Sequence, residues 1–294
     1  MPFKFSQYNE TDTLKTVIIG RWDGYRKVTE YTEIVNADQR ESLPDVAQLK
    51  PEFETFQRVL EKNGIEVLVP EYVGKFVYDQ LTPRDIAVVI NDKLVLCNMV
   101  KKSRRYEAAG IFPLIRNFSG GEPDVLIPPA DCLLEGGDIM VDKGRVLVGI
   151  SQRTNEKGFK WLQSVFGRQT EVVPVYTKKP EDDEQVLHLD CTFNPVGRHH
   201  ALIYEEGFIT APECLKTDYE WIRVSKGEQR ALATNVISLA GDVVIARDHP
   251  LCKRVTGIMR DYGIRVEEIK FDGAPSTGGS FRCCTLPLIR ERNL

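Results

Sequence analysis

The sequence predicts an α/β fold built from repeated units. Short runs rich in valine and isoleucine alternate with amphipathic helical patterns along the 294 residues. Three times the order is strand, tight polar turn, strand, helix and strand, with turns at 91–92, 142–144 and 241–242. With a further turn at Gly197-Arg198, the turns follow one another about every 50 residues, which suggests a closed array of similar units. An ordinary α/β sheet is the alternative that this periodicity leaves open.

The individual elements follow from local patterns. In the first helix Phe53, Phe56 and Leu60 keep helical spacing, and Gly64 is the expected C-cap. The first 70 or so residues carry a strand, a helix and a strand, which could complete a fifth unit. Strands are expected at 16–20, 65–69, 85–90, 93–97, 138–142, 145–149, 170–175, 235–240 and 242–246, helices near 45–63, 104–118, 154–166 and 250–262, and a solvated loop at 178–184.

Composition excludes several classes of function. The net charge is −4, with 39 basic and 43 acidic residues, which argues against a nucleic acid or an anionic membrane as the main partner. No apolar run approaches the roughly 20 residues that span a bilayer. We expect one domain over residues 1–294, because no linker is visible. The sequence leaves a homodimer open.

The cysteines indicate a reducing compartment. There are seven, an odd number at scattered positions, and none forms the CxxC pair of zinc ribbons or thioredoxins. The start of the chain is too polar for a signal peptide, so a cytoplasmic location is expected. Most of the thiols are expected to be buried and inert.

Polar residues gather beside strands in four different units. In a closed array, equivalent strand ends can converge on one central pocket. The four clusters are Thr82-Pro83-Arg84-Asp85, Leu134-Glu135-Gly136-Gly137-Asp138, His188-Leu189-Asp190 and Gly278-Gly279-Ser280-Phe281-Arg282-Cys283-Cys284.

The chemistry of these residues suits a flat cation. A guanidinium group presents only N–H donors in one plane, and carboxylates such as Asp85, Glu135 and Asp190 bind it by charge-assisted hydrogen bonds. The thiolate of Cys283 is a nucleophile strong enough for its central carbon, and His188 could move protons. The Gly278-Gly279 pair would let backbone approach the ligand closely. Taken singly, each residue also has a structural interpretation, as a turn former, a cap or core filler.

Together the four clusters resemble the signatures of the guanidine-modifying superfamily, the penteins, which includes dimethylarginine dimethylaminohydrolases, arginine deiminases and amidinotransferases. The LEGGD, HLD and C-terminal Gly-Gly-…-Cys motifs occur in the family's order, over roughly residues 8–290. The resemblance implies the pentein α/β propeller, with five ββαβ-like units around a pseudo-fivefold axis. It also implies a small guanidino substrate and neither metal nor cofactor.

The resemblance further implies the role of each site residue. Cys283 would be the nucleophile and His188 the acid and base, with Glu135 and Asp190 as the other catalytic groups. Asp85 and Glu135 would grip the guanidinium, with Asp190 assisting and orienting His188. Asp138 would be a further substrate-binding residue. Arg104 and Arg153 resemble the arginines that bind the substrate carboxylate, and Asp79 resembles the contact for its α-amine.

Several residues depart from a single subfamily. Arginine deiminases typically have an arginine where this chain has Gly278, whereas Arg84 is deiminase-like. The segment 8–14 and the Phe281-Arg282-Cys283 run are similar to amidinotransferases. The sequence therefore predicts a hydrolase that converts arginine or a methylated arginine to citrulline. An amidinotransferase and a non-catalytic guanidine-binding protein remain the alternatives.

Overall fold

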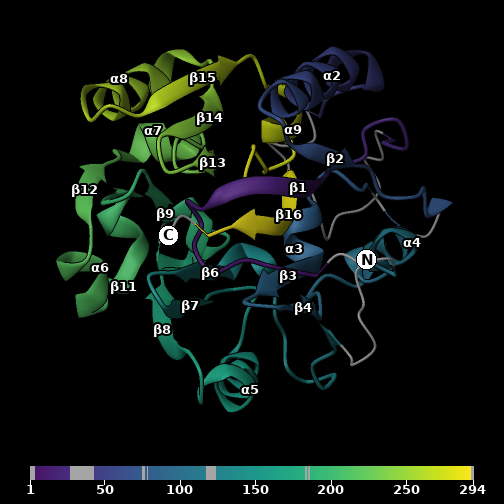
Figure 1. Cartoon of the computed structure of the whole chain (residues 1–294), viewed down its shortest axis with the longest axis vertical. Coiled ribbons are helices and arrows are strands. Elements are labelled where there is room, and N and C mark those ends of the chain that lie inside the picture. The colour runs from purple at the N-terminus through teal and green to yellow at the C-terminus, as the bar shows by residue number, and fades with distance from the viewer. Residues whose placement is uncertain are drawn as a thin grey trace.

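The computed structural model describes residues 4–26, 43–74, 77, 79–116, 124–182, 184 and 186–292. Within these ranges the strands form five small sheets, each with an antiparallel pair and a parallel third strand (Figure 1). In spatial order the sheets are β16 (Thr285–Glu291), β1 (Thr13–Ile19) and β2 (Glu66–Leu68); β3 (Ala87–Ile90), β4 (Lys93–Leu96) and β5 (Val125–Leu126); β11 (Phe208–Thr210), β8 (Glu171–Thr177), β7 (Arg145–Ile150) and β6 (Ile139–Asp142); β12 (Glu220–Arg223), β10 (His200–Ile203) and β9 (Phe193–Val196); and β13 (Ile237–Ala240), β14 (Val243–Arg247) and β15 (Arg265–Ile269). The predicted α/β class is confirmed.

The longer helices lie at the periphery of the molecule, outside the sheets (Figure 1). They are α2 (Val46–Lys62), α5 (Glu156–Phe166) and α8 (Lys253–Asp261). The short helices are α3 (Pro83–Ile86), α4 (Phe112–Ile115), α6 (Glu213–Thr217), α7 (Lys226–Arg230) and α9 (Gly273–Ser276). The 3₁₀ turns are η2 (Lys102–Arg104), η3 (Glu107–Ile111), η4 (Gly136–Asp138), η5 (Pro180–Asp182), η6 (Leu189–Cys191), η7 (Glu205–Gly207) and η8 (Pro250–Cys252).

Helix α2 shows why the sequence folds as it does locally. The Asp45 carboxylate caps it by accepting a hydrogen bond from the Gln48 N–H at 2.9 Å. Its apolar stripe is fully buried, with the Phe56 ring 4.9 Å from that of Phe281. Gly64 follows the helix at φ +75°, a conformation that glycine adopts without strain. The predicted helix end is therefore confirmed, and the helix packs beside the turn that precedes β16.

The predicted tight turns are also confirmed. Asn91 joins β3 to β4 at φ 56°, and Gly144 joins β6 to β7 at φ 73°. Gly197 has φ 64° between β9 and β10. These left-handed conformations suit asparagine and glycine, so the local sequence fixes where the strand pairs reverse.

Five core clusters connect the sheets in sequence. Ile18 and Val89 share one cluster, so the β1 sheet packs on the β3 sheet. Further clusters join the β3 sheet to the β6 sheet, the β6 sheet to the β9 sheet, and the β9 sheet to the β13 sheet. In the fifth cluster Val17 packs with Ile237, so the last sheet contacts the first. Each sheet is thus buried against two others, which accounts for near-continuous apolar strands.

Some expected elements were wrong in detail. The continuous helix expected at 104–118 is replaced by η2, η3 and α4 as far as residue 116, and residues 117–118 lie outside the described ranges. Pro113 lacks the N–H that a helix interior needs and stands in the first turn of α4 instead. The strands expected from 85 and 138 begin at 87 and 139, because short turns precede them. Strands β5, β9, β10, β11, β12, β15 and β16 were not predicted.

Among the described residues, none of the helices has the length and apolar character needed to cross a membrane.

Candidate active site

The candidate residues occupy the same place in different sheets, namely the turn before the first strand. Asp85 lies in α3, which precedes β3. Glu135 immediately precedes η4, and Asp138 is the last residue of η4, before β6. His188 immediately precedes η6 and Asp190 lies within it, before β9. Cys283 lies in the turn before β16. The predicted convergence follows, because these turns contact one another.

His188 is the centre of the arrangement. Its ring is buried, with Nε2 2.8 Å from Oε2 of Glu135 and Nδ1 3.8 Å from Oδ1 of Asp85. Burial opposes the charged ring, but Asp85 and Glu135 outweigh burial and raise the pKa of His188 to about 9. The imidazolium is therefore the form present near neutral pH, ready to donate a proton.

Each of the two carboxylates beside His188 is bound by an arginine. Nη1 of Arg104 lies 2.8 Å from Oδ2 of Asp85, and Nη1 of Arg153 lies 3.3 Å from both oxygens of Glu135. Burial alone would raise the pKa of both acids, but His188 and the arginines lower it. The neighbouring cations therefore favour the ionised form of both carboxylates.

The two arginines differ in how fully they are engaged. Arg104 donates from Nε and Nη2 to Glu107 at 2.8 and 3.0 Å, and also from Nη2 to Oγ1 of Thr82 at 2.8 Å. Within the described part of the chain, Arg153 is engaged through Nη1 alone. Arg104 thus holds Asp85 in place, whereas Nε and Nη2 of Arg153 are left to donate to another group.

Both carboxylate oxygens of Asp138 accept hydrogen bonds from the chain itself. Oδ1 accepts from the Leu189 N–H at 2.9 Å, and Oδ2 accepts from the Ser151 hydroxyl at 2.7 Å. Burial raises the pKa of Asp138 to about 6. Asp138 therefore holds the backbone next to His188.

The Gly136-Gly137 pair allows two close approaches. A Cβ on Gly137 would lie 2.7 Å from the His188 ring, and one on Gly136 would lie 2.1 Å from the Arg84 carbonyl oxygen. Gly279 plays a similar part, because a Cβ there would lie 2.7 Å from Cγ2 of Thr82. These glycines let the turns of different sheets pack together, so the close approach is between segments of the chain.

Cys283 lies among polar side chains, whereas Cys284 lies in the core. Sγ of Cys283 is 3.6 Å from Oδ2 of Asp190 and receives a hydrogen bond from Nδ2 of Asn235 at 3.1 Å. Burial, Asp190 and Asp85 raise the pKa of the Cys283 thiol well above its usual range. Both cysteines lie in a turn, and their side chains face different surroundings.

Further buried, charged side chains contact the turn that carries Cys283. Arg282 donates to Asp190 at 2.9 Å and to Glu10 at 3.1 Å. Nε of Arg84 donates to the Arg282 carbonyl oxygen at 3.3 Å, and Arg84 is wholly buried. The roles of Arg282 and Glu10 were not predicted. Arg84 therefore supports the turn that carries the nucleophile candidate.

Among the described residues, no hydrogen bond or ion pair joins Asp79 to this group, although Arg104 and Asp85 both affect its pKa. Its Oδ1 accepts a hydrogen bond from the Leu81 N–H at 3.0 Å, and burial raises its pKa. Its expected contact with a substrate amine stays a prediction.

One subset of the site has the composition of a metal centre. Ligand atoms of Asp85, Glu135 and His188 lie within 4.8 Å of one another. Two carboxylates and an imidazole could hold a divalent cation. Arg104 and Arg153, which bind these carboxylates, compete with that role.

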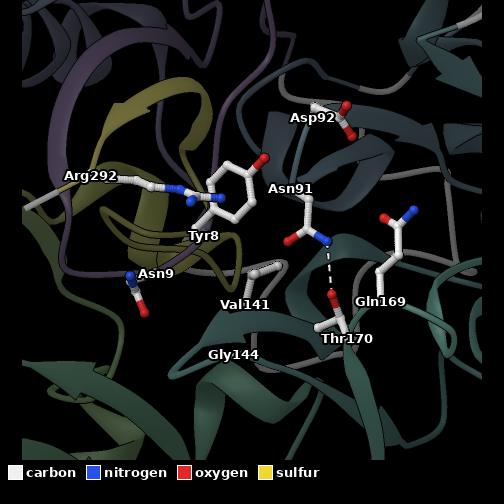
Figure 2. A pocket seen from close by; sticks show the side chains of 9 residues that line it. All are labelled: Tyr8, Asn9, Asn91, Asp92, Val141, Gly144, Gln169, Thr170 and Arg292. Carbon is white, nitrogen blue, oxygen red and sulfur yellow. Dashed lines mark hydrogen bonds between the residues drawn. The ribbon is translucent and has the colours of Figure 1, made fainter. Parts of the chain in front are cut away.

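A surface pocket of about 470 Å³ lies at the other ends of the strands, beside the β3–β4 and β6–β7 turns (Figure 2). Figure 2 shows Arg292 against the ring of Tyr8, and the Asn91 amide, which donates to Thr170 at 2.9 Å. Its lining contains none of the candidate catalytic residues. The cluster around His188 and Cys283 is therefore separate from this pocket.

Comparison with known proteins assigns the family. A family model described as N,N dimethylarginine dimethylhydrolase, eukaryotic, matches residues 29–290, most of the chain. The chain belongs to this family. It is therefore a member of the guanidine-modifying pentein superfamily of enzymes, as the motifs indicated.

Individual relatives of this dimethylarginine dimethylhydrolase family member include hydrolases and transferases. The uncharacterized protein YkgA of Bacillus subtilis (strain 168) is 33% identical over 88% of this chain and 87% of its own. The amidinotransferase SxtG of Microseira wollei has a TM-score of 0.82 at 19% identity, covering 99% of this chain and 98% of its own. A DDAH mutant from Pseudomonas aeruginosa, complexed with citrulline, has a TM-score of 0.74 at 22% identity, covering 94% and 99%. At these identities the two structures show the shared α/β fold.

Proposed function

We propose that the protein is a cysteine-dependent hydrolase that cleaves a guanidinium C–N bond of arginine or a methylated arginine. The observation that carries the proposal is the pair of ionised carboxylates beside His188, each already bound by a guanidinium of the chain itself. Two such acids around one imidazolium form a site for a planar cation. Cys283 supplies the nucleophile, and Asp190 is its acidic neighbour.

The reaction would begin with guanidinium bound between Asp85 and Glu135. Its positive charge favours the thiolate, and the thiol proton leaves through Asp190. Sγ then forms a bond to the guanidinium carbon. The C–N bond breaks as His188 donates its proton to the departing ammonia or alkylamine, leaving a covalent thiouronium.

Water completes the turnover. His188, now neutral, takes a proton from water as the oxygen bonds to the thiouronium carbon. The C–S bond breaks as the ureido C=O forms, the remaining hydroxyl proton passes to the released amine, and the thiolate is restored. The products are a ureido compound, which is citrulline for an arginine-like substrate, and the amine.

We further infer that the five sheets are the blades of one closed α/β propeller around a pseudo-fivefold axis. The core clusters that join each sheet to the next, and the last to the first, support this arrangement. It places the five turns at the axis. The seven free cysteines support the proposal of a cytoplasmic location.

An amidinotransferase is the second candidate. The two segments that resemble amidinotransferases contact each other, since Glu10 pairs with Arg282. In that case an acceptor amine, and not water, would resolve the thiouronium.

Product analysis separates these reactions. The enzyme is incubated with arginine, methylated arginines and agmatine in ¹⁸O-labelled water, with and without glycine or lysine, and products are identified by mass spectrometry. We expect a ureido product carrying ¹⁸O, unchanged after prolonged EDTA dialysis. A new guanidine formed only with an acceptor amine would establish transfer. Activity lost to EDTA and restored by Mn²⁺ would contradict the covalent mechanism.

The α-carboxylate of an arginine-like substrate gives a separate prediction. If Arg153 binds an α-carboxylate by a planar fork, Arg153→Lys should reduce kcat/KM for arginine-like substrates by about 30- to 1000-fold, the equivalent of about 2–4 kcal/mol. Agmatine lacks the carboxylate and should be much less affected. Kinetics with both substrates measure this difference.

The exposed Arg168 supplies the control, since Arg168→Lys should change neither rate. Equal losses for arginine and agmatine in Arg153→Lys would mean that Arg153 acts only through Glu135. A wild-type preference for agmatine would point to a simpler guanidine as substrate.

A further inference from the structure

Asn235 occupies, in the β13 sheet, the position that site residues occupy in the other sheets. It precedes β13 (Ile237–Ala240) as Asp85 precedes β3 and Cys283 precedes β16, in each case by two residues. Its side chain is buried, with 1% of its surface exposed. The fifth sheet therefore contributes an amide to the same place, where the other sheets contribute acids, imidazole and thiol.

The orientation of this amide follows from its contacts. Oδ1 accepts hydrogen bonds from two backbone N–H groups, those of Cys283 at 3.1 Å and Ser280 at 3.2 Å. An amide oxygen accepts and an amide nitrogen donates, so the nitrogen must be the atom that faces the sulfur. Nδ2 lies 3.1 Å from Sγ of Cys283. The backbone itself fixes an N–H donor on the reacting atom.

Asn235 also holds the turn that carries Cys283. Its backbone carbonyl accepts from the Arg282 N–H at 3.3 Å, in addition to the two bonds on Oδ1. Its own N–H donates to the carbonyl of Leu232, a residue at φ 62° in a tight turn. One residue thus fixes both the path of the nucleophile's backbone and the surroundings of its sulfur.

The sulfur needs such a donor because its other surroundings oppose a negative charge. Asp190 and Cys191 face it from η6, Asp85 faces it from α3, and Cys284 follows it in the chain, and together with burial they disfavour the thiolate. The guanidinium of Arg282 is directed to Asp190 and Glu10. Among the described residues, Asn235 alone donates a hydrogen bond to Sγ.

We propose that Asn235 is a further catalytic group, whose amide N–H holds the sulfur of Cys283 in place and stabilises the thiolate. The inference rests on the proposed role of Cys283 as the nucleophile. A hydrogen bond to a charged acceptor stabilises that form more than one to a neutral acceptor. Losing it should therefore lower the nucleophile's reactivity more than it lowers substrate binding.

A neighbouring asparagine provides a matched control. Asn194 is also buried, and its amide donates to the carbonyl oxygens of Thr234 at 2.8 Å and Val236 at 2.9 Å, on either side of Asn235. Asn194→Ser therefore disturbs the same segment without removing the donor to sulfur.

The test is the rate of Cys283 alkylation by iodoacetamide as a function of pH, followed by peptide mass spectrometry. Asn235→Ser should slow alkylation near neutral pH by about 10- to 100-fold, with the midpoint moved up by about one to two pH units. Asn235→Asp, which places a carboxylate beside the sulfur, should slow it further. In turnover, kcat should fall more than KM changes. Asn194→Ser should alter the alkylation rate by less than about threefold.

The assay needs no guanidine substrate, so it separates this inference from the proposed function. Folding is checked by circular dichroism, and either Asn235 variant suffices if the other does not fold. Midpoints unchanged in a folded Asn235 variant, or shifted equally in Asn194→Ser, would overturn the inference. A shift confined to the Asn235 variants would support it, even if no guanidine were turned over.

Discussion

Replacing Cys283 with serine is expected to reduce turnover by at least about 1,000-fold, because a hydroxyl beside Asp190 and Asn235 is a far weaker nucleophile than a thiolate. Guanidine binding should persist, since Asp85 and Glu135 are untouched. Steady-state rates and equilibrium binding of arginine, measured on the same protein, separate the two effects.

Cys284 is the matched control for that substitution. Its side chain lies wholly within the core that includes Phe56 and Phe281. Cys284→Ser buries a hydroxyl and should cost about 1–3 kcal/mol of stability, while the folded protein keeps most of its turnover. If instead Cys284→Ser were inactive and Cys283→Ser active, the nucleophile would be the second cysteine.

His188→Ala is expected to lower kcat by about 100- to 10,000-fold, the usual contribution of a positioned acid and base. The loss should be largest for substrates whose leaving amine needs a proton. His199, which is exposed, supplies a control that should keep wild-type rates. Near-normal turnover in His188→Ala would rule out this role.

The pH dependence of the wild-type enzyme follows from the same residue. Asp85 and Glu135 raise the pKa of His188 to about 9, so the acid form prevails below that pH. The step that expels the amine should therefore slow as pH rises through about 9. A rate that remained constant well above that pH would mean that another group supplies the proton.

Much of the fold could be predicted because its signals are local. Asn91 and Gly144 occupy left-handed conformations that few residues tolerate, and the helix at 45–63 has an apolar stripe with a cap at each end. The continuous helix predicted from residue 104 was wrong. The apolar spacing there is helical, but the structure divides the segment into short helical turns. A Cβ on Gly110 would lie 2.5 Å from the Glu71 carbonyl oxygen, a contact that no local pattern reveals.

Prediction of the site from the sequence has the same limit, because local patterns do not show which turns meet. Motif residues such as His188 and Cys283 could be predicted from their types and order, but their pairings depend on turns brought together from different sheets. Thus the sequence did not reveal that Arg104 is bound by Glu107 as well as Asp85. Asn235, like Asp85, is the first residue of an expected strand, and this shared position is a signal that could have found it.

The most direct test of the central claim is to trap the covalent intermediate. His188→Ala is mixed with an arginine analogue that carries an alkylthiolate leaving group, quenched in acid, and examined by intact-protein and peptide mass spectrometry. Such a leaving group departs without a proton from the enzyme, so the thiouronium should form and persist. We predict an amidino adduct on the peptide that contains Cys283, localised to Cys283 itself. An adduct on another residue, or an unmodified Cys283 during continuing product formation, would contradict the account.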